Sequence, residues 1–283
     1  MLKRLFLSLY ALEQKTLGRF GIGRWPVIRT VKKWIFLALR PKFGEAWGMK
    51  FHLDAVHGLP DPATYKSGVA RVIREELHEG ETVVDVGANI GLFTCLMAKA
   101  VGPGGKVFAF EPEPANLELL EKNLQDNSIG NVVVIQKALS DKAGKLTLAA
   151  RGAHTSFGLS DGAQEKTKVE LTRLDDLAKL AGRKVSLVKM DITGYEAKAL
   201  RGMKQTILRN KNIRLLSAFC PAYLKRVGDA PLDYLKNISG LGLKIFEINA
   251  DRRLRIMRED FPAFIAKYSG GGKILQAEIF CAR

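Results

Sequence analysis

The stretch ETVVDVGANIGLFTCLMAKAVGPGGKVFAFEP, residues 81–112, alternates between strand-like and helix-like patterns. Residues 82–86 form a short apolar, β-branched run of the kind found in buried parallel strands. Two glycines and an asparagine interrupt this run, and residues 89–101 then carry apolar side chains at helical spacing up to a Gly-Pro pair. Residues 106–110 predict the next strand. The order strand, glycine turn, helix and strand indicates a doubly wound α/β sheet.

Polar residues near the carboxyl ends of these two strands predict a ligand site. In a doubly wound sheet, ligands bind beyond the carboxyl ends of the strands, against the first strand–helix turn. Glycines let the ligand approach the backbone there, and the helix N-terminus offers free N–H groups. Glu111 follows Gly91 by about 20 residues, the spacing at which an acidic side chain binds a ribose diol. Dinucleotides and S-adenosylmethionine share that ribose, so Glu111 alone does not distinguish them.

The turn itself favours S-adenosylmethionine as the cofactor. A dinucleotide site requires G-x-G-x-x-G, because a pyrophosphate needs bare backbone at the helix start. This chain instead has Gly87, Asn89 and Gly91, with Asp85 two residues before the first glycine. A carboxylate at Asp85 would repel a pyrophosphate, but it can pair with the ammonium group of S-adenosylmethionine. An ordinary α/β turn capped by asparagine is the alternative.

Composition and charge divide the chain into two parts. Its 283 residues are 47% hydrophobic and 26% charged, enough for a globular core. Three cysteines without paired or metal-ligand spacing predict buried thiols, a reducing cytoplasmic compartment and no metal site. The net charge is +16, and residues 1–50 hold eleven lysines and arginines against two glutamates, a balance of +9. We therefore expect a basic helical segment at 1–50 and a catalytic domain at 51–283.

The basic segment has apolar residues at helical spacing between its cations, in runs too short to span a bilayer. A basic amphipathic helix with tryptophan and phenylalanine suits the anionic cytoplasmic face of a membrane. A pair of helices packed on the catalytic domain, with solvated lysines, is an equally open interpretation. A nucleic-acid surface is the least favoured one, because only charge supports it.

The remaining patterns continue the α/β alternation. Residues 44–59 indicate irregular structure or a hairpin. Residues 145–150 and 168–171 resemble a hairpin, joined by a glycine-rich loop at 152–162 that is either a lid or a plain solvent loop. Further strands are expected at 131–136, 185–190, 212–219, 243–248 and 273–281, and helices at 61–80, 113–127, 196–208 and 232–238.

Residues at the ends of two further strands are candidates for contact with the ligand. Ala138 and Leu139 follow the third strand and are predicted to contact the adenine ring, although a simple exit from the strand explains them as well. Lys189 and Asp191 share one face of their strand end by the two-residue period, so both side chains could reach the cleft.

Five motifs in the same order resemble the FkbM family of methyltransferases. The resemblance covers roughly residues 80–283 and implies a Rossmann-like class I domain. Such a domain has seven mostly parallel strands, the last antiparallel, with helices on both faces. It also implies methyl transfer to an oxygen, often a sugar or polyketide hydroxyl. The residues that carry it are VVDVGANIGLFT (83–94), FAFEP (108–112), KALSD (137–141), LTRLDDL (171–177), and KMDITGYE (189–196) followed by LRG (200–202).

The resemblance also implies roles for single residues. The methionine end of S-adenosylmethionine, the methyl donor, would be held by Asp85, Gly87, Asn89 and Gly91. Glu111, with Pro112 beside it in the motif, would bind the ribose, and Asp191 would lie beside the transferred methyl group.

Methyl transfer to a hydroxyl requires a proton acceptor. The candidate bases are Lys189, Asp191, Glu196 and His154, and Lys189 and Asp191 could instead only pair with each other.

Two departures from the family pattern concern the acceptor side. Thr193 stands where members usually have a glutamate, and Ala218 is near the place of another acidic residue. We therefore expect either metal-independent O-methylation of a glycan, lipid-linked or secondary-metabolite hydroxyl, or no catalysis. In the second case the chain would be an S-adenosylmethionine-binding or membrane-associated assembly protein with a decayed acceptor site.

Overall fold

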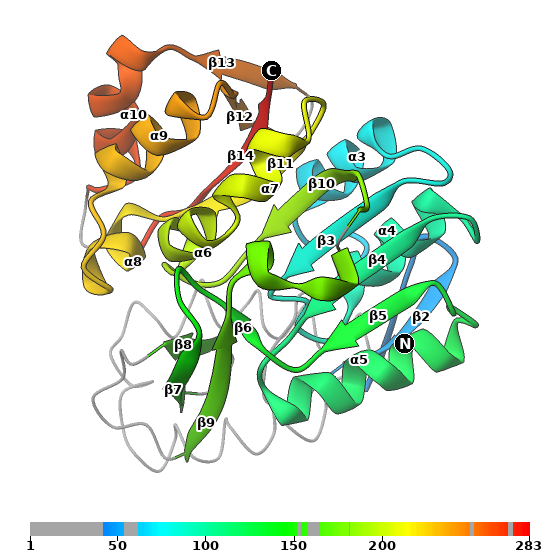
Figure 1. Ribbon diagram of the computed structural model, residues 1–283. Coiled ribbons are helices and arrows are strands. Elements are labelled where there is room, and N and C mark those ends of the chain that lie inside the picture. The colour runs from blue at the N-terminus through cyan, green and yellow to red at the C-terminus, as the bar shows by residue number, and fades with distance from the viewer. Residues whose placement is uncertain are drawn as a thin grey trace, which may run out of the picture.

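A sheet of eight strands lies at the centre of the protein (Figure 1). The computed structural model describes residues 42–53, 62–151, 154–157, 165–180, 182–249, 252–270 and 274–283. In spatial order the strands are β13 (Arg253–Ile256), β12 (Lys244–Ile248), β14 (Ala277–Ala282), β11 (Arg214–Phe219), β10 (Val185–Met190), β3 (Thr82–Val86), β4 (Lys106–Phe110) and β5 (Val132–Ile135).

The strand directions confirm a Rossmann-like sheet. The pairs from β11 to β5 are parallel, whereas β14 is antiparallel to both β11 and β12. The predicted antiparallel last strand is therefore present. The predicted number of seven strands is one too low, because β13 pairs antiparallel with β12 at the edge. Its sequence, RLRI, has too few apolar residues to indicate a strand by itself.

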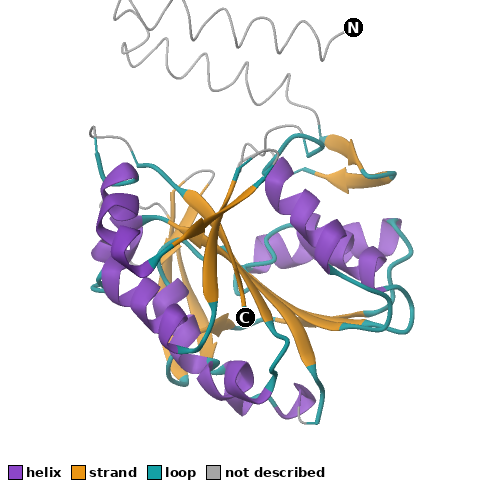
Figure 2. Cartoon of the chain, turned by 90° about the horizontal axis from the view of Figure 1, so that it is seen from above, coloured by secondary structure: helices purple, strands orange, loops and turns teal. Residues whose placement is uncertain are grey.

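Helices cover both faces of the sheet (Figure 2). Alternate strand residues enter different core layers: Val83 and Leu187 pack with α3 and α4, and Val84 and Val188 pack on the opposite side. The first face is covered by α3 (Ser67–Glu76), α4 (Leu92–Val101) and α5 (Pro114–Asp126). The second is covered by α6 (Glu196–Gly202), α7 (Lys204–Arg209), α8 (Pro221–Arg226), α9 (Pro231–Gly240) and α10 (Phe261–Lys267). Short 3₁₀ turns are η2 (Leu174–Asp176), η3 (Ala178–Leu180) and η4 (Arg258–Asp260).

A smaller, four-stranded sheet lies beside the main one. Its order is β6 (Ala138–Leu139), β9 (Glu165–Thr172), β7 (Gly144–Arg151) and β8 (His154–Phe157). The antiparallel β7–β9 pair confirms the predicted hairpin. The prediction of one loop over 152–162 is wrong, because 154–157 pair with β7 as a strand. The other residues of that loop, and the His154 side chain, lie outside what the structure describes.

The predicted boundary after residue 50 is also wrong. It falls inside a hairpin of β1 (Phe43–Ala46) and β2 (Met49–His52). Phe51 is fully buried and packs in one cluster with Leu120 of α5, and the backbone N–H of His52 donates to Asn123 Oδ1 at 2.7 Å. The hairpin therefore belongs to the packed domain. The predicted basic helices fall in residues 1–41, outside the described part. No helix among the described residues is long and apolar enough to cross a bilayer.

The expected helix at 196–208 is divided at Met203 into α6 and α7. Asp175, from the fourth motif, accepts the backbone N–H groups of Gln205 and Thr206 at 3.0 and 2.8 Å. This carboxylate caps the first turn of α7 and explains the new helix start, which helical spacing alone does not reveal.

The LRG and KALSD motifs meet in space. Arg201 forms an ion pair with Asp141 at 3.0 Å, and a Cβ added to Gly202 would lie 1.9 Å from the Ser140 carbonyl oxygen. The backbone that directly follows β6 is therefore in contact with the end of α6, and glycine is the residue that permits it.

This contact predicts the effect of one methyl group. Gly202→Ala is expected to lower the free energy of unfolding by about 1–3 kcal/mol, because backbone must move to admit the side chain. Gly240→Ala is the matched control, since Gly240 also ends a helix and has no atom within 4 Å of its added Cβ. Urea unfolding measures both. A Gly202 variant as stable as the Gly240 variant would contradict the prediction.

Candidate active site

Three strand ends meet at one edge of the sheet and form the candidate site. The backbone N–H groups of Gly87 and Ala88 donate to the Phe110 carbonyl at 2.9 and 3.0 Å. The N–H of Asp191 donates to Val86 O at 3.0 Å. These bonds bring together the turn after β3, the residues after β4 and the residues after β10, as the sequence predicted.

The two glycines of the turn serve the protein's own packing. Gly87 and Gly91 have φ angles of +80° and +88°. A Cβ on Gly87 would lie 2.4 Å from Asp191 O, and one on Gly91 would lie 2.4 Å from Leu120 Cδ1. The sequence-based explanation, that glycine admits a ligand to the backbone, stays a prediction beside this packing reason. Glycine here lets β10 and α5 approach the turn.

Asp85 and Lys189 form a buried ion pair beneath the turn. They are register partners on β3 and β10, and Lys189 Nζ lies 2.8 Å from Asp85 Oδ1. Thr94 donates to the other Asp85 oxygen at 2.7 Å. The Asp85 side chain has no exposed surface, and that of Lys189 is 5% exposed. A direct contact of Asp85 with the ammonium group of S-adenosylmethionine would need an accessible oxygen, whereas this side chain has no exposed surface.

The Glu111 carboxylate is held by three N–H groups. It accepts from the backbone of Asn89 at 2.7 Å, from the backbone of Glu113 at 3.0 Å and from Asn116 Nδ2 at 3.2 Å. Burial raises the pKa of Glu111 to about 7, although these donors lower it. In the described part of the chain, the buried Asn116 Oδ1 has no hydrogen-bond partner. Glu111 and Asn116 thus offer acceptor capacity for donated hydroxyls, which fits the ribose of S-adenosylmethionine.

The other residues predicted to contact S-adenosylmethionine have different surroundings. Asn89 has a φ of +52°, and its Oδ1 accepts the N–H of Ile90 at 2.7 Å, so it caps the turn. Pro112 is half-buried between Glu111 and α5. Ala138 and Leu139 are 4% and 2% exposed and pack in the main core, and their contact with adenine stays a prediction.

Glu196 is turned into the loop that follows β10. Its oxygens accept the backbone N–H groups of Ile192 at 2.9 Å and Gly194 at 2.7 Å, and the residue is 2% exposed. Thr193, between these donors, has a left-handed φ of +51°. The carboxylate that the sequence offered as a base therefore holds the shape of the 191–196 loop.

The same burial predicts a pH effect on stability. It raises the pKa of Glu196 from 4.5 to about 7, against the lowering effect of the N–H groups. Because the folded-state pKa lies above the unfolded one, this stabilisation is complete below pH 4.5 and is lost as pH rises through 7. We expect the wild type to lose about 3 kcal/mol of unfolding free energy relative to Glu196→Gln between pH 4.5 and 7.5. Urea unfolding at several pH values measures the difference, and parallel curves would contradict it.

Asp191 pairs with a lysine that the sequence analysis did not select. Lys66 Nζ lies 2.6 Å from Asp191 Oδ2 and 2.7 Å from Glu278 Oε1. Burial lowers the pKa of Lys66, but the two carboxylates raise it above its ordinary value overall, which keeps the ammonium charged. Lys66 directly precedes α3, and no sequence signal identified it. Glu278 is a single charge within the strand AEIFCA, and that was an available signal.

Glu278 also changes the interpretation of Ala218. The two are register partners in the antiparallel β11–β14 pair, so their side chains share one face. The departure at Ala218 stands, but it does not leave this side of the site without a carboxylate. Strand β14 supplies the carboxylate that β11 lacks.

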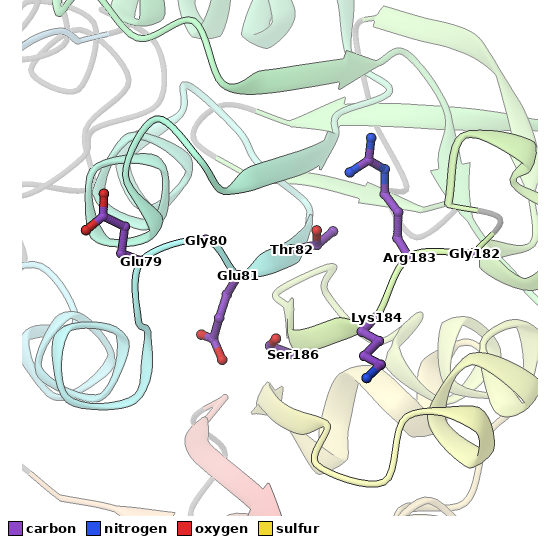
Figure 3. Close-up of a pocket in the computed structure, with 8 residues that line it drawn as sticks. All are labelled: Glu79, Gly80, Glu81, Thr82, Gly182, Arg183, Lys184 and Ser186. Carbon is purple, nitrogen blue, oxygen red and sulfur yellow. The ribbon is translucent and has the colours of Figure 1, made fainter.

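The hollow in Figure 3 lies at the opposite edge of the sheet. It has a volume of about 490 Å³ and adjoins the amino ends of β3 and β10, at Thr82 and Lys184. The Arg183 and Lys184 side chains extend away from each other there (Figure 3). Because ligands of such sheets bind at carboxyl ends, this hollow is not the donor site.

Comparisons with known proteins agree with the motifs. The methyltransferase FkbM domain model matches residues 85–224. The chain is 28% identical over 197 residues to the hexuronic acid methyltransferase AglP of Haloferax volcanii, covering 67% of this chain and 75% of that protein. It is 45% identical over 69 residues to 31-O-demethyl-FK506 methyltransferase FkbM of Streptomyces tacrolimicus, covering 24% of this chain and 26% of that protein. It is 30% identical over 154 residues to ribosomal RNA large subunit methyltransferase E of Nitrosomonas europaea, covering 50% of this chain and 73% of that protein.

The matched residues include the turn at residues 87–91, which we call the donor turn. They also include Glu111 and the loop at residues 191–196. The chain belongs to the FkbM family of class I, Rossmann-like methyltransferases, for which S-adenosylmethionine is the cofactor.

Proposed function

We propose that this protein methylates a hydroxyl oxygen of a glycan, a lipid-linked sugar or a secondary metabolite. One observation carries the proposal: the Asp191 carboxylate is 26% exposed, and its backbone contacts the donor turn. The names of two relatives, a hexuronic acid methyltransferase and an FK506 methyltransferase, support an oxygen acceptor of this class. A small-molecule or glycan acceptor is favoured over nucleic acid.

The chain's own residues have distinct parts in this reaction. S-adenosylmethionine supplies a methyl group activated by its sulfonium. The acceptor oxygen forms the new O–CH₃ bond as the C–S bond breaks, and the Asp191 carboxylate takes the hydroxyl proton. Lys189 and Glu196 fix the strand end and the loop that position Asp191, because both are buried in contacts with the protein.

The test is transfer of labelled methyl from S-adenosylmethionine to glycan, lipid and RNA fractions from cells. Label in an alkali-stable methyl ether of the glycan or lipid fraction is the expected result. Label in RNA alone would replace this proposal with methylation of RNA.

A non-catalytic role is the second candidate, and one observation favours it. Lys66 pairs with both Asp191 and Glu278, the two carboxylates of the acceptor side. If no fraction is labelled while the donor still binds, the chain is an S-adenosylmethionine-binding or membrane-associated assembly protein.

We further propose that the segment before the β1–β2 hairpin holds the protein on the cytoplasmic face of an anionic membrane, as the +9 balance of residues 1–50 suggests. Each cation near such a surface contributes about 1 kcal/mol, which salt screens. Deleting residues 1–40 is expected to abolish sedimentation with phosphatidylserine vesicles while donor affinity is kept. The deletion leaves the β1–β2 hairpin intact, so unfolding of the shortened chain would support a packed helical cap instead.

A further inference from the structure

Three charged side chains from distant parts of the chain meet beside the donor turn. Lys66 comes from the start of α3, Asp191 follows β10 and Glu278 lies on β14. The Lys66 ammonium is within 2.6–2.7 Å of one oxygen from each carboxylate. None of the three side chains is fully buried: Lys66 is 16% exposed, Asp191 is 26% exposed and Glu278 is 19% exposed. A polar acceptor beside the donor turn could therefore contact this cluster.

The cluster has the arrangement of a small cation site in which the cation is covalently tethered. Two carboxylates, one after β10 and one on β14, on either side of β11, converge on one positive centre, as they do on magnesium or calcium. The oxygen-to-nitrogen distances are only slightly longer than the 2.0–2.6 Å typical of oxygen ligands on these ions. Without Lys66, two carboxylates would face each other with a charge of −2, which a divalent ion neutralises.

We infer that Lys66 takes the place of a divalent metal ion between Asp191 and Glu278, so that methyl transfer needs no added metal. A fixed positive charge there stabilises the negative charge that develops on the acceptor oxygen as its proton moves to Asp191. Lys66 keeps its own proton throughout, and acts as an electrostatic and positioning group. The catalytic part of this inference rests on the proposed function, while the cation exchange does not.

The first test measures metal binding and requires no methyl transfer. Lys66→Ala is titrated with Mn²⁺ and followed by electron paramagnetic resonance at neutral pH, beside the wild type. The variant is expected to bind one Mn²⁺ at least tenfold more tightly than the wild type does. Adding Glu278→Gln to Lys66→Ala is expected to remove that gain. Equal Mn²⁺ affinity in the variant and the wild type, or a gain that survives Glu278→Gln, would overturn the inference.

A second variant keeps the inference testable if Lys66→Ala does not fold. Lys66→Gln keeps the first two methylenes of the lysine side chain and replaces the ammonium group with a neutral amide. An increase in its melting temperature on adding Mn²⁺ is the same expected gain. No such increase in a folded Lys66→Gln protein would count against the inference.

The third measurement uses the labelled-methyl assay with and without a chelator. Wild type and Lys66→Arg, which keeps a fixed cation, are expected to resist the chelator. Lys66→Ala is expected to be chelator-sensitive and to regain activity with Mg²⁺ or Mn²⁺. Wild-type activity that collapses under chelation would overturn the inference while supporting methyl transfer. A wild type without activity would overturn the proposed function and leave the Mn²⁺ experiment as the decisive test.

Discussion

Glu111→Ala is expected to weaken binding of S-adenosylhomocysteine by about 30- to 1000-fold, equivalent to about 2–4 kcal/mol. Two losses contribute to this effect. The ribose loses charge-assisted hydrogen bonds, and the turn loses the acceptor for the Asn89 and Glu113 N–H groups. Isothermal titration calorimetry measures the affinity.

Two controls separate these losses and test the choice of cofactor. Glu118→Ala removes an exposed carboxylate from α5, the helix that follows Glu111, and its affinity is expected to stay within twofold of the wild type. Glu111→Gln keeps one oxygen acceptor and is expected to have an intermediate affinity. NAD is expected not to bind, because the spacing of Gly87 and Gly91 does not match the G-x-G-x-x-G of a dinucleotide site. Unchanged affinity in Glu111→Ala, or tight NAD binding, would refute the assignment of the donor site.

Asp191→Asn is expected to lower kcat by about 100-fold or more, the usual size of a lost general base. Asparagine keeps the shape of the side chain but cannot take the acceptor proton, and it removes one of the two carboxylates that hold Lys66. Donor affinity is expected to stay within about twofold, because the donor turn is bound through the Asp191 backbone. Initial rates of labelled-methyl transfer and calorimetry give the two values.

Asp229→Asn provides the comparison for a lost carboxylate elsewhere. Asp229 accepts hydrogen bonds from Lys198 and Arg201 of α6, and it is not one of the residues that follow β3, β4 and β10 at the candidate site. The kcat of Asp229→Asn is expected to remain within a few-fold of the wild-type value. If Asp191→Asn retains wild-type kcat, the proton is taken by another group and the proposed role of Asp191 is incorrect.

The sequence by itself determined the central strands and the donor turn. The predicted bounds 82–86, 106–110 and 185–190 agree with β3, β4 and β10. A parallel strand covered on both faces must be apolar throughout, so its limits are visible in the local sequence. The turn is also visible in the local sequence. Its glycines, Asn89 and Glu111 occur at spacings set by one strand–turn–helix–strand unit.

Only the tertiary structure decided which polar groups are buried in contacts with the fold and which stay partly exposed beside the donor turn. Lys189 and Glu196 are close to Asp191 in sequence, yet their partners are Asp85, 104 residues away, and the backbone of the 191–196 loop. Lys66 lies 125 residues before Asp191, and Glu278 reaches the site through pairing of β14 with β11. A charged side chain takes whichever opposite charge the folded chain brings within about 3 Å, and buried charges require such a partner. Sequence spacing contains the period of a strand or helix, but not the register in which distant segments meet.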